Sequence, residues 1–136
     1  MKKEIFQNIC SQVFSSLQDN EQLTIYLEGE NSQYFRFNDS KLRQSGIIED
    51  YAVTISLFSG KKSLQSATTV SSDIESSVSN LKNEIQALRD PLSLIPENEF
   101  TSFPDNFDSI EIIKSGKLPP RSEILEALME IITKDY

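Results

Sequence analysis

Apolar residues recur at helical spacing in the first segment of the chain. Neighbouring positions and positions four apart are apolar, which is the pattern of a helix that buries one face. This stripe consists of Ile5, Phe6, Ile9, Cys10, Val13, Phe14 and Leu17. Asp19 and Asn20 follow the stripe, and we expect them to end the helix. The position of Cys10 within the stripe favours a small core residue over a nucleophile.

The segment from residue 22 to residue 70 alternates between apolar and polar positions, which is the period of half-buried strands. Strands are predicted over 22–28, 33–38, 41–48, 51–58 and 62–70. Turns are expected at 29–31, 38–40 and 59–61, and a bend or bulge at Gly46. Because connections this short join neighbouring strands, the pattern predicts an antiparallel meander, with the last strand near an edge.

A second helix is predicted after the strands. Ser72 and Glu75 have the S-x-x-E spacing of a capping box, in which each side chain satisfies a backbone donor. Apolar residues at helical spacing then run from Ile74 to Leu88. We expect Asp90-Pro91 to end this helix, because the residue before a proline is driven out of the helical conformation.

The remainder of the chain changes character. Residues 96–118 combine prolines with aromatic residues at irregular spacing, which predicts an ordered strap across the domain or onto a neighbour rather than a solvated linker. Residues 119–136 form an amphipathic helix with a wide apolar face. We therefore expect an α+β domain over 1–95, in which an antiparallel meander of about five strands is flanked by the N-terminal and second helices.

The charge of the chain excludes several classes of partner. The 13 basic and 21 acidic residues give a net charge of −8, and no cluster of Lys and Arg is present to neutralise phosphates. We therefore expect neither nucleic acid nor an anionic membrane as a partner. No apolar run approaches the ~20 residues that span a bilayer. Polar residues interrupt any signal-peptide core, and the single cysteine suits a reducing compartment, so a cytoplasmic protein is expected.

Candidate chemistry is sparse. Without histidine the chain cannot form Ser-His or Cys-His catalytic pairs, and one cysteine cannot build a zinc site. The Ser59–Lys62 and Ser79–Lys82 segments match a Ser-Lys catalyst in spacing alone. Asp105, Asp108 and Glu111 do not have the spacing of a calcium loop. We therefore predict no catalytic residue and no metal ligand in this chain.

Three cations surround the turn expected at 38–40. Arg36, Lys41 and Arg43 are the candidate contact residues, because they can hold a carboxylate or an acidic patch of a partner. The alternative is that they are exposed cations on a strand face, which keep the protein in solution.

Short motifs in this order resemble the N-terminal domain of the TldD/PmbA family, over roughly residues 1–100. The similar features are Leu27-Glu28-Gly29, Arg36 through Ser45, Ser59-Gly60-Lys61, Ala67-Thr68-Thr69 leading to Asp73-Ile74, Asp90-Pro91 and Leu94-Ile95-Pro96. The chain departs from the family pattern at Glu49-Asp50-Tyr51, where family members usually have glycine before the next strand.

The family comprises zinc metallopeptidases that are also called modulators of DNA gyrase and are linked to peptide maturation. Its catalytic members hold zinc with an H-E-x-x-x-H motif downstream of this domain, so no catalytic or metal residue transfers to the present chain. The resemblance implies a non-catalytic accessory domain that helps enclose the chamber through which peptide reaches the zinc. Its implied partners are the downstream domain of a parent chain or a family paralogue, in homo- or heterodimers.

Two alternatives remain open. The first is a stand-alone interaction module that binds a partner protein, or an extended peptide along a sheet edge. The second, and less favoured, is a small enzyme that uses carboxylate or Ser-Lys chemistry.

Overall fold

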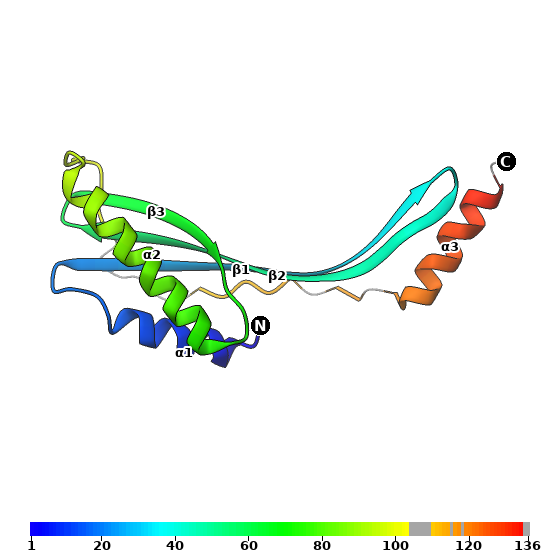
Figure 1. The fold of residues 1–136 in the computed structure, drawn as a ribbon, viewed down its shortest axis with the longest axis horizontal. Helices are drawn as coiled ribbons and strands as arrows, with labels where there is room; N and C mark the ends of the chain where they lie inside the picture. The colour runs from blue at the N-terminus through cyan, green and yellow to red at the C-terminus, as the bar shows by residue number, and fades with distance from the viewer. Residues whose placement is uncertain (104–109, 115, 118, 135–136) are drawn as a thin grey trace. The chain divides into compact units, whose positions relative to one another are not determined.

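The computed structural model describes residues 1–103, 110–114, 116–117 and 119–134. Within them the chain forms three helices and three strands (Figure 1). In chain order these are α1 (Lys3–Phe14), β1 (Glu21–Asn38), β2 (Lys41–Ser59), β3 (Lys62–Thr69), α2 (Ile74–Leu94) and α3 (Arg121–Lys134). The predicted α+β class, with an N-terminal, a second and a C-terminal helix, is confirmed.

The strands form one antiparallel sheet in the order β1-β2-β3, which confirms the meander and places β3 at an edge. The prediction of about five strands is wrong, because the described residues contain three longer strands. Strand β1 contains the first two predicted strands together with the turn expected at 29–31. Strand β2 contains the third and fourth, and β3 corresponds to the fifth.

Two glycines explain why the long strands were expected to be interrupted. Gly29 and Gly46 lie inside β1 and β2, where a turn and a bend were predicted. A β-carbon at Gly29 would lie 2.6 Å from Cδ1 of Tyr51, and one at Gly46 would lie 2.7 Å from Cε1 of Tyr34. Each glycine therefore leaves room for a tyrosine ring from the neighbouring strand. This close approach, and not a turn, accounts for both glycines.

The other two predicted turns are present. Asp39 and Ser40 connect β1 to β2 with φ values of 47° and 54°, a left-handed conformation that Asp tolerates better than most residues. Gly60 lies between β2 and β3 with φ 57°, which glycine adopts without strain. Strands β2 and β3 then pair without a break along the whole of β3.

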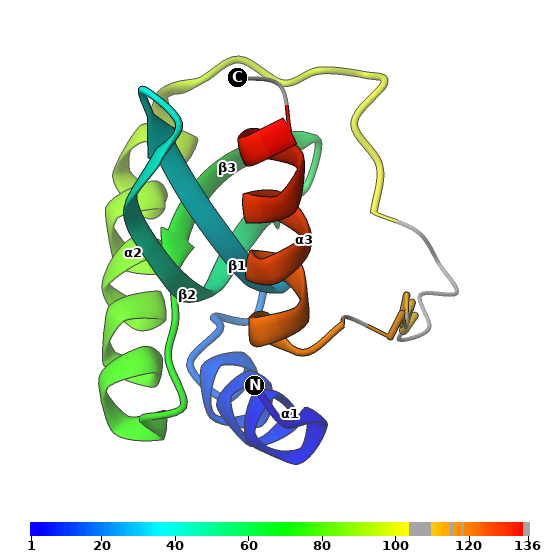
Figure 2. The same cartoon turned by 90° about the vertical axis from the view of Figure 1, so that its right-hand side faces the viewer.

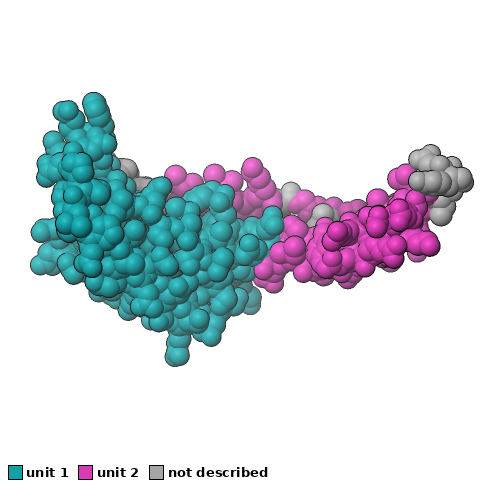
Figure 3. Space-filling view, turned by 45° about the horizontal axis from the view of Figure 1, so that its top comes forward, with its two compact units in different colours: residues 1–30, 50–106 teal, residues 31–49, 107–136 magenta. Residues whose placement is uncertain are grey.

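The chain divides into two compact units, which Figure 3 colours separately. Unit 1 consists of residues 1–30 and 50–106, and unit 2 of residues 31–49 and 107–136. Unit 1 contains α1, α2 and β3, and unit 2 contains the β1–β2 turn and α3. Strands β1 and β2 contribute residues to both units.

Unit 1 holds the hydrophobic core. Helices α1 and α2 pack on each other, and their apolar stripes meet alternate residues of β2. The residues with the least exposed side chains at this junction are Ile9, Val13, Val53, Ile55, Leu57, Leu81 and Ile85. Because the inward residues of β2 are two apart, they all lie on one face of the sheet. Both helices therefore cover that face.

Helix α2 begins and ends later than the sequence predicted. Its N-cap is Asp73, whose side chain accepts a hydrogen bond from Ser76 N at 3.2 Å, so the predicted capping box of Ser72 with Glu75 is wrong. The helix also continues through Pro91 to Leu94. A proline in the last turn removes one helical hydrogen bond, and the burial of Leu92 in the core holds that turn in place.

The segment after α2 still belongs to unit 1, and two contacts attach it near the β2–β3 turn. Asn98 N donates to Lys61 O at 3.0 Å, and the Phe103 ring meets the Phe58 ring edge-on with centroids 5.3 Å apart. The first part of the predicted strap is therefore attached to the β2–β3 turn. Outside the described residues lie Asp105, Phe107 and Asp108.

In unit 2, helix α3 lies beside the hairpin that ends in the β1–β2 turn (Figure 2). Arg121, the first residue of α3, donates from Nη2 to Oγ of Ser45, and its guanidinium carbon lies 5.9 Å from the centroid of the Phe35 ring. Across the hairpin, Gln44 Nε2 donates to Oη of Tyr34 at 3.0 Å. No described side chain of unit 2 is fully buried, in contrast to unit 1.

Candidate interaction surface

The three candidate cations lie on the two strands that flank the β1–β2 turn in unit 2. Arg36 lies near the end of β1, and Lys41 and Arg43 lie at the start of β2. All three are exposed, and their side chains form no hydrogen bond or ion pair with the residues that the structure describes. The turn therefore presents three unengaged cations next to one acidic residue, Asp39. This arrangement is suited to a partner that carries carboxylates, in a chain whose net charge is −8.

Arg121 is a further cation of unit 2 near the hairpin, and sequence reasoning missed its contact. Its contacts with Ser45 and Phe35 attach the start of α3 to the hairpin. Arg121 directly follows two prolines, and this position predicts the start of a helix. It does not predict the contacts of Arg121 with Ser45 and Phe35. Arg121 therefore has a structural partner, unlike the three candidate cations.

Several large apolar side chains are exposed outside the core. Ile110, Ile112 and Ile113 are 82%, 79% and 76% exposed, and Ile47 and Ile131 are about three-fifths exposed. Contiguous exposed apolar surface marks sites that bind another protein, and three of these isoleucines lie within four positions of the chain. The sequence analysis did not single out these isoleucines, although three of them occur together in the short run I-E-I-I-K.

Unit 1 has a shallow depression of about 800 Å³. It is lined by the α1–β1 loop, by the β2–β3 turn and by the end of α2. Its two cations, Lys62 and Arg89, already have partners. Lys62 Nζ donates to Ser93 O at 2.9 Å, near the carboxyl end of α2.

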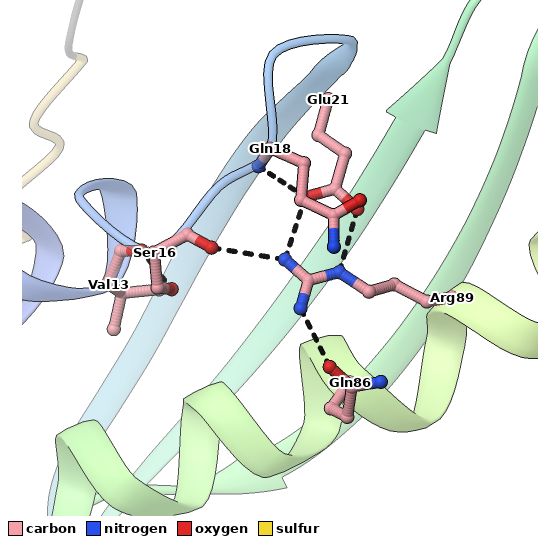
Figure 4. Close-up of polar contacts among 6 residues, drawn as sticks. All are labelled: Val13, Ser16, Gln18, Glu21, Gln86 and Arg89. Carbon is pink, nitrogen blue, oxygen red and sulfur yellow. Dashed lines mark hydrogen bonds and ion pairs between the residues drawn. The ribbon is translucent and has the colours of Figure 1, made fainter.

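Arg89 is the centre of the polar contacts in this depression (Figure 4). Its Nε and Nη2 each donate to one carboxylate oxygen of Glu21, at 2.8 Å. The same guanidinium donates to Ser16 O at 3.0 Å and to Oε1 of Gln86 at 2.8 Å. Glu21 Oε2 also accepts from Gln18 N at 2.8 Å. These bonds join the α1–β1 loop to α2.

The electrostatics of the pair agree with its geometry. Hydrogen bonds from Arg89 hold the pKa of Glu21 below its usual range, and the hydrogen bonds to Glu21 raise the pKa of Arg89. Both groups are therefore charged at neutral pH. Since the donors of Arg89 are engaged within the chain, the depression serves to fasten a loop to a helix.

Candidate catalytic groups are not assembled in the part of the chain that the structure describes. Burial raises the pKa of the Cys10 thiol to about 11, which keeps it protonated and unreactive at neutral pH. Lys62 is bonded to a backbone carbonyl rather than to the hydroxyl of Ser59. Among the described residues, no group of three or more Cys, Asp or Glu side chains could hold a metal ion.

Comparisons with other proteins leave the identity of the chain open. None of the described helices is long and apolar enough to cross a membrane. No family model, curated protein or solved structure matches the chain. The likeness to the TldD/PmbA family therefore rests on the sequence motifs alone.

Proposed function

We propose that this chain is the non-catalytic N-terminal domain of a TldD/PmbA-like, zinc-dependent peptidase that acts in proteolysis or peptide maturation. In this role it packs on the downstream catalytic domain and helps enclose the chamber through which peptide reaches the zinc. The observation that carries the proposal is the exposure of Ile110, Ile112 and Ile113. Burial of one such side chain stabilises a protein by about 1.5–3 kcal/mol, so this segment is suited to a covering protein surface.

The small size of unit 2 also favours a covering domain. A two-stranded hairpin is marginal on its own, and α3 adds one helix with few buried side chains. A larger neighbour supplies the apolar surface that unit 2 lacks. The cations Arg36, Lys41 and Arg43 then face carboxylates of that neighbour or of the peptide.

A stand-alone interaction module is the second candidate function. It is favoured by the outer edge of β3, which pairs with no other strand of the described residues and which an extended peptide can join as a further strand. The two candidates differ in what lies downstream, because only the first requires a catalytic domain.

The activity of the purified chain tests the proposal. We expect no zinc-dependent hydrolysis of unfolded peptides at any zinc concentration, because the chain offers no zinc ligands of the family type. A sample treated with a chelator and a mock purification control for contaminating peptidases. Cleavage that needs zinc and copurifies with the chain would end the proposal.

Docking provides a second test, with the downstream region of the native protein supplied as a separate chain. The double variant Ile112→Ser, Ile113→Ser is expected to weaken the complex at least about tenfold, since it removes apolar surface that the partner buries. The matched control is Leu94→Ser, which changes an equally exposed residue at the end of α2. Equal binding by the double variant and the wild type would contradict this docking surface.

A further inference from the structure

The outer edge of β3 is open. Within the described part of the chain β3 pairs with β2 alone, and Figure 1 draws no helix or strand along its other side. Val70 N donates to Tyr51 O at 3.1 Å, and in an antiparallel ladder every second residue bonds the same neighbour. Ser63, Gln65 and Ala67 therefore direct their backbone N–H and C=O groups away from β2.

One side-chain contact agrees with this assignment. Asn80 Nδ2 donates to Thr69 O at 3.1 Å, which requires this carbonyl to point away from β2. The same Asn80 donates to Oγ1 of Thr68, and Glu84 accepts from Oγ of Ser66. Helix α2 therefore lies over the face of β3, and the edge from Ser63 to Ala67 has no partner among the described residues.

Strand β3 begins at Lys62, whose Nζ is bonded to Ser93 O, and the rest of its edge lacks the features that usually protect an edge strand. Natural proteins guard open edges with lysines, prolines, bulges or very short strands. Residues 63–69 contain no charged residue, proline or glycine, and the pairing with β2 has no bulge. The side chains of Gln65, Ala67 and Thr69 are exposed. An uncharged, regular and exposed edge is a template for pairing with another strand.

We propose that two copies of this chain pair through their β3 edges. A dimer with a two-fold axis requires antiparallel pairing, and an axis at Ser66 places Gln65 of each copy opposite Ala67 of the second copy. In this register the outward N–H and C=O groups of Gln65 and Ala67 exchange hydrogen bonds. The two Ser66 residues form the pair without hydrogen bonds, in which side chains approach most closely.

Charge complementarity at the two ends of β3 favours a second copy as the occupant. Each chain carries −8, and because residues 63–69 are uncharged, the contact itself brings no like charges together. Antiparallel pairing also brings the start of β3, with the exposed Lys61, to the end of the second copy's β3. Asp73 and Glu75 follow directly after that end. The two-fold axis repeats this favourable approach of opposite charges on both sides.

The proposal extends beyond the accessory-domain function and does not depend on it. The pairing uses unit 1 and leaves the isoleucines of residues 110–113 free to dock elsewhere. A monomeric wild-type chain would overturn the β3 pairing while leaving the accessory-domain proposal intact. Zinc-dependent peptidase activity in the purified chain would overturn the accessory-domain proposal and leave the β3 pairing intact.

A pair of double variants tests the register, with self-association measured by sedimentation equilibrium. The wild type is expected to show a concentration-dependent dimer. Gln65→Lys with Ala67→Lys places lysine opposite lysine twice, and should raise the dimer dissociation constant at least about tenfold. Gln65→Glu with Ala67→Lys places glutamate opposite lysine and should restore the dimer. Both variants lose the hydrogen bond from Gln65 Nε2 to Oγ of the buried Ser56, so they should unfold at about the same urea concentration as each other, and the comparison between them isolates the pairing.

Cross-linking then locates the axis. In a Cys10→Ser background, Ser66→Cys is expected to form a disulfide-linked dimer on mild oxidation, because the two residues face each other. Gln65→Cys is the control, because residue 65 of each copy lies opposite residue 67 of the second copy and not opposite residue 65. A wild type that is monomeric at every concentration tested, or cross-linking at residue 65 and not at residue 66, would overturn the proposal.

Discussion

At the scale of single residues, the pair of Arg89 and Glu21 joins two distant parts of unit 1, the start of β1 and helix α2. The two residues are 68 positions apart, and their side chains are 19% and 7% exposed. Exposed ion pairs contribute little to the free energy of unfolding, but a bidentate pair that is largely shielded from solvent contributes more. Removal of either partner also leaves the other charge partly buried.

We predict that Arg89→Ala lowers the free energy of unfolding by about 1.5–3 kcal/mol, the range for hydrogen bonds to charged groups. Arg89→Lys keeps the charge but loses the bidentate contact with Glu21, so its free energy of unfolding should lie between those of the wild type and Arg89→Ala. Urea unfolding at neutral pH measures both. If Arg89→Ala unfolded at the wild-type urea concentration, the contact would have no role in stability.

The same pair predicts a pH dependence. The pKa of Glu21 is lowered in the folded chain, so its contribution to stability is fully present above the pKa of an unfolded glutamate. The contribution is lost as the pH falls through the folded pKa, because the protonated acid no longer pairs with Arg89. Glu21→Gln should therefore show a flatter decline of stability in acid. A decline as steep as that of the wild type would assign the acid sensitivity to other carboxylates.

The sequence could not predict contacts between residues that lie on different elements. The sequence predicts a turn at Gly29 and a bend at Gly46, because glycine commonly marks both. Their actual neighbours, Tyr51 and Tyr34, lie on another strand, and no local pattern reports a cross-strand ring. The bond between Arg89 and Glu21 was missed for the same reason, since it joins distant parts of the chain.

At the scale of elements, apolar periodicity predicted the helices and the inward faces of the strands. The alternation of Val53, Ile55 and Leu57 predicted the buried face of β2, and the structure confirms it. Element ends were less predictable. The motif at Ser72 and Glu75 suggested a cap, but the adjacent Asp73 competes for the same role and its shorter side chain reaches Ser76 N.

We predict that Asp73→Ala destabilises the chain by about 0.5–2 kcal/mol, the usual cost of a lost N-cap. Ser72→Ala is the matched control and should leave stability nearly unchanged. Thermal unfolding followed by circular dichroism measures both variants. The opposite ranking would restore the capping box that the sequence suggested.

At the scale of the whole molecule, the two units differ in how their side chains are buried. The buried apolar residues of the described chain all belong to unit 1. Unit 2 depends on contacts such as those of Arg121, with side chains that remain partly exposed. Sequence patterns did not reveal this division, because the alternation along β1 and β2 does not report which part of each strand the helices cover.

We predict that amides of residues 31–49 exchange with solvent at least about tenfold faster than those of residues 53–57, because local opening of unit 2 exposes little buried surface. Hydrogen exchange followed by mass spectrometry gives both rates on the same sample. The paired part of β2 in unit 1 is the internal control. Equal protection of the two segments would mean that the hairpin is as stable as the core.

The mass of the native gene product tests the central claim most directly. The product is captured from its own cells with an antibody against unit 1 and weighed intact. We predict a chain of several hundred residues that carries an H-E-x-x-x-H motif downstream of this domain. A native product that ends with Tyr136 would contradict the accessory-domain function and leave the interaction module as the explanation of the exposed surfaces.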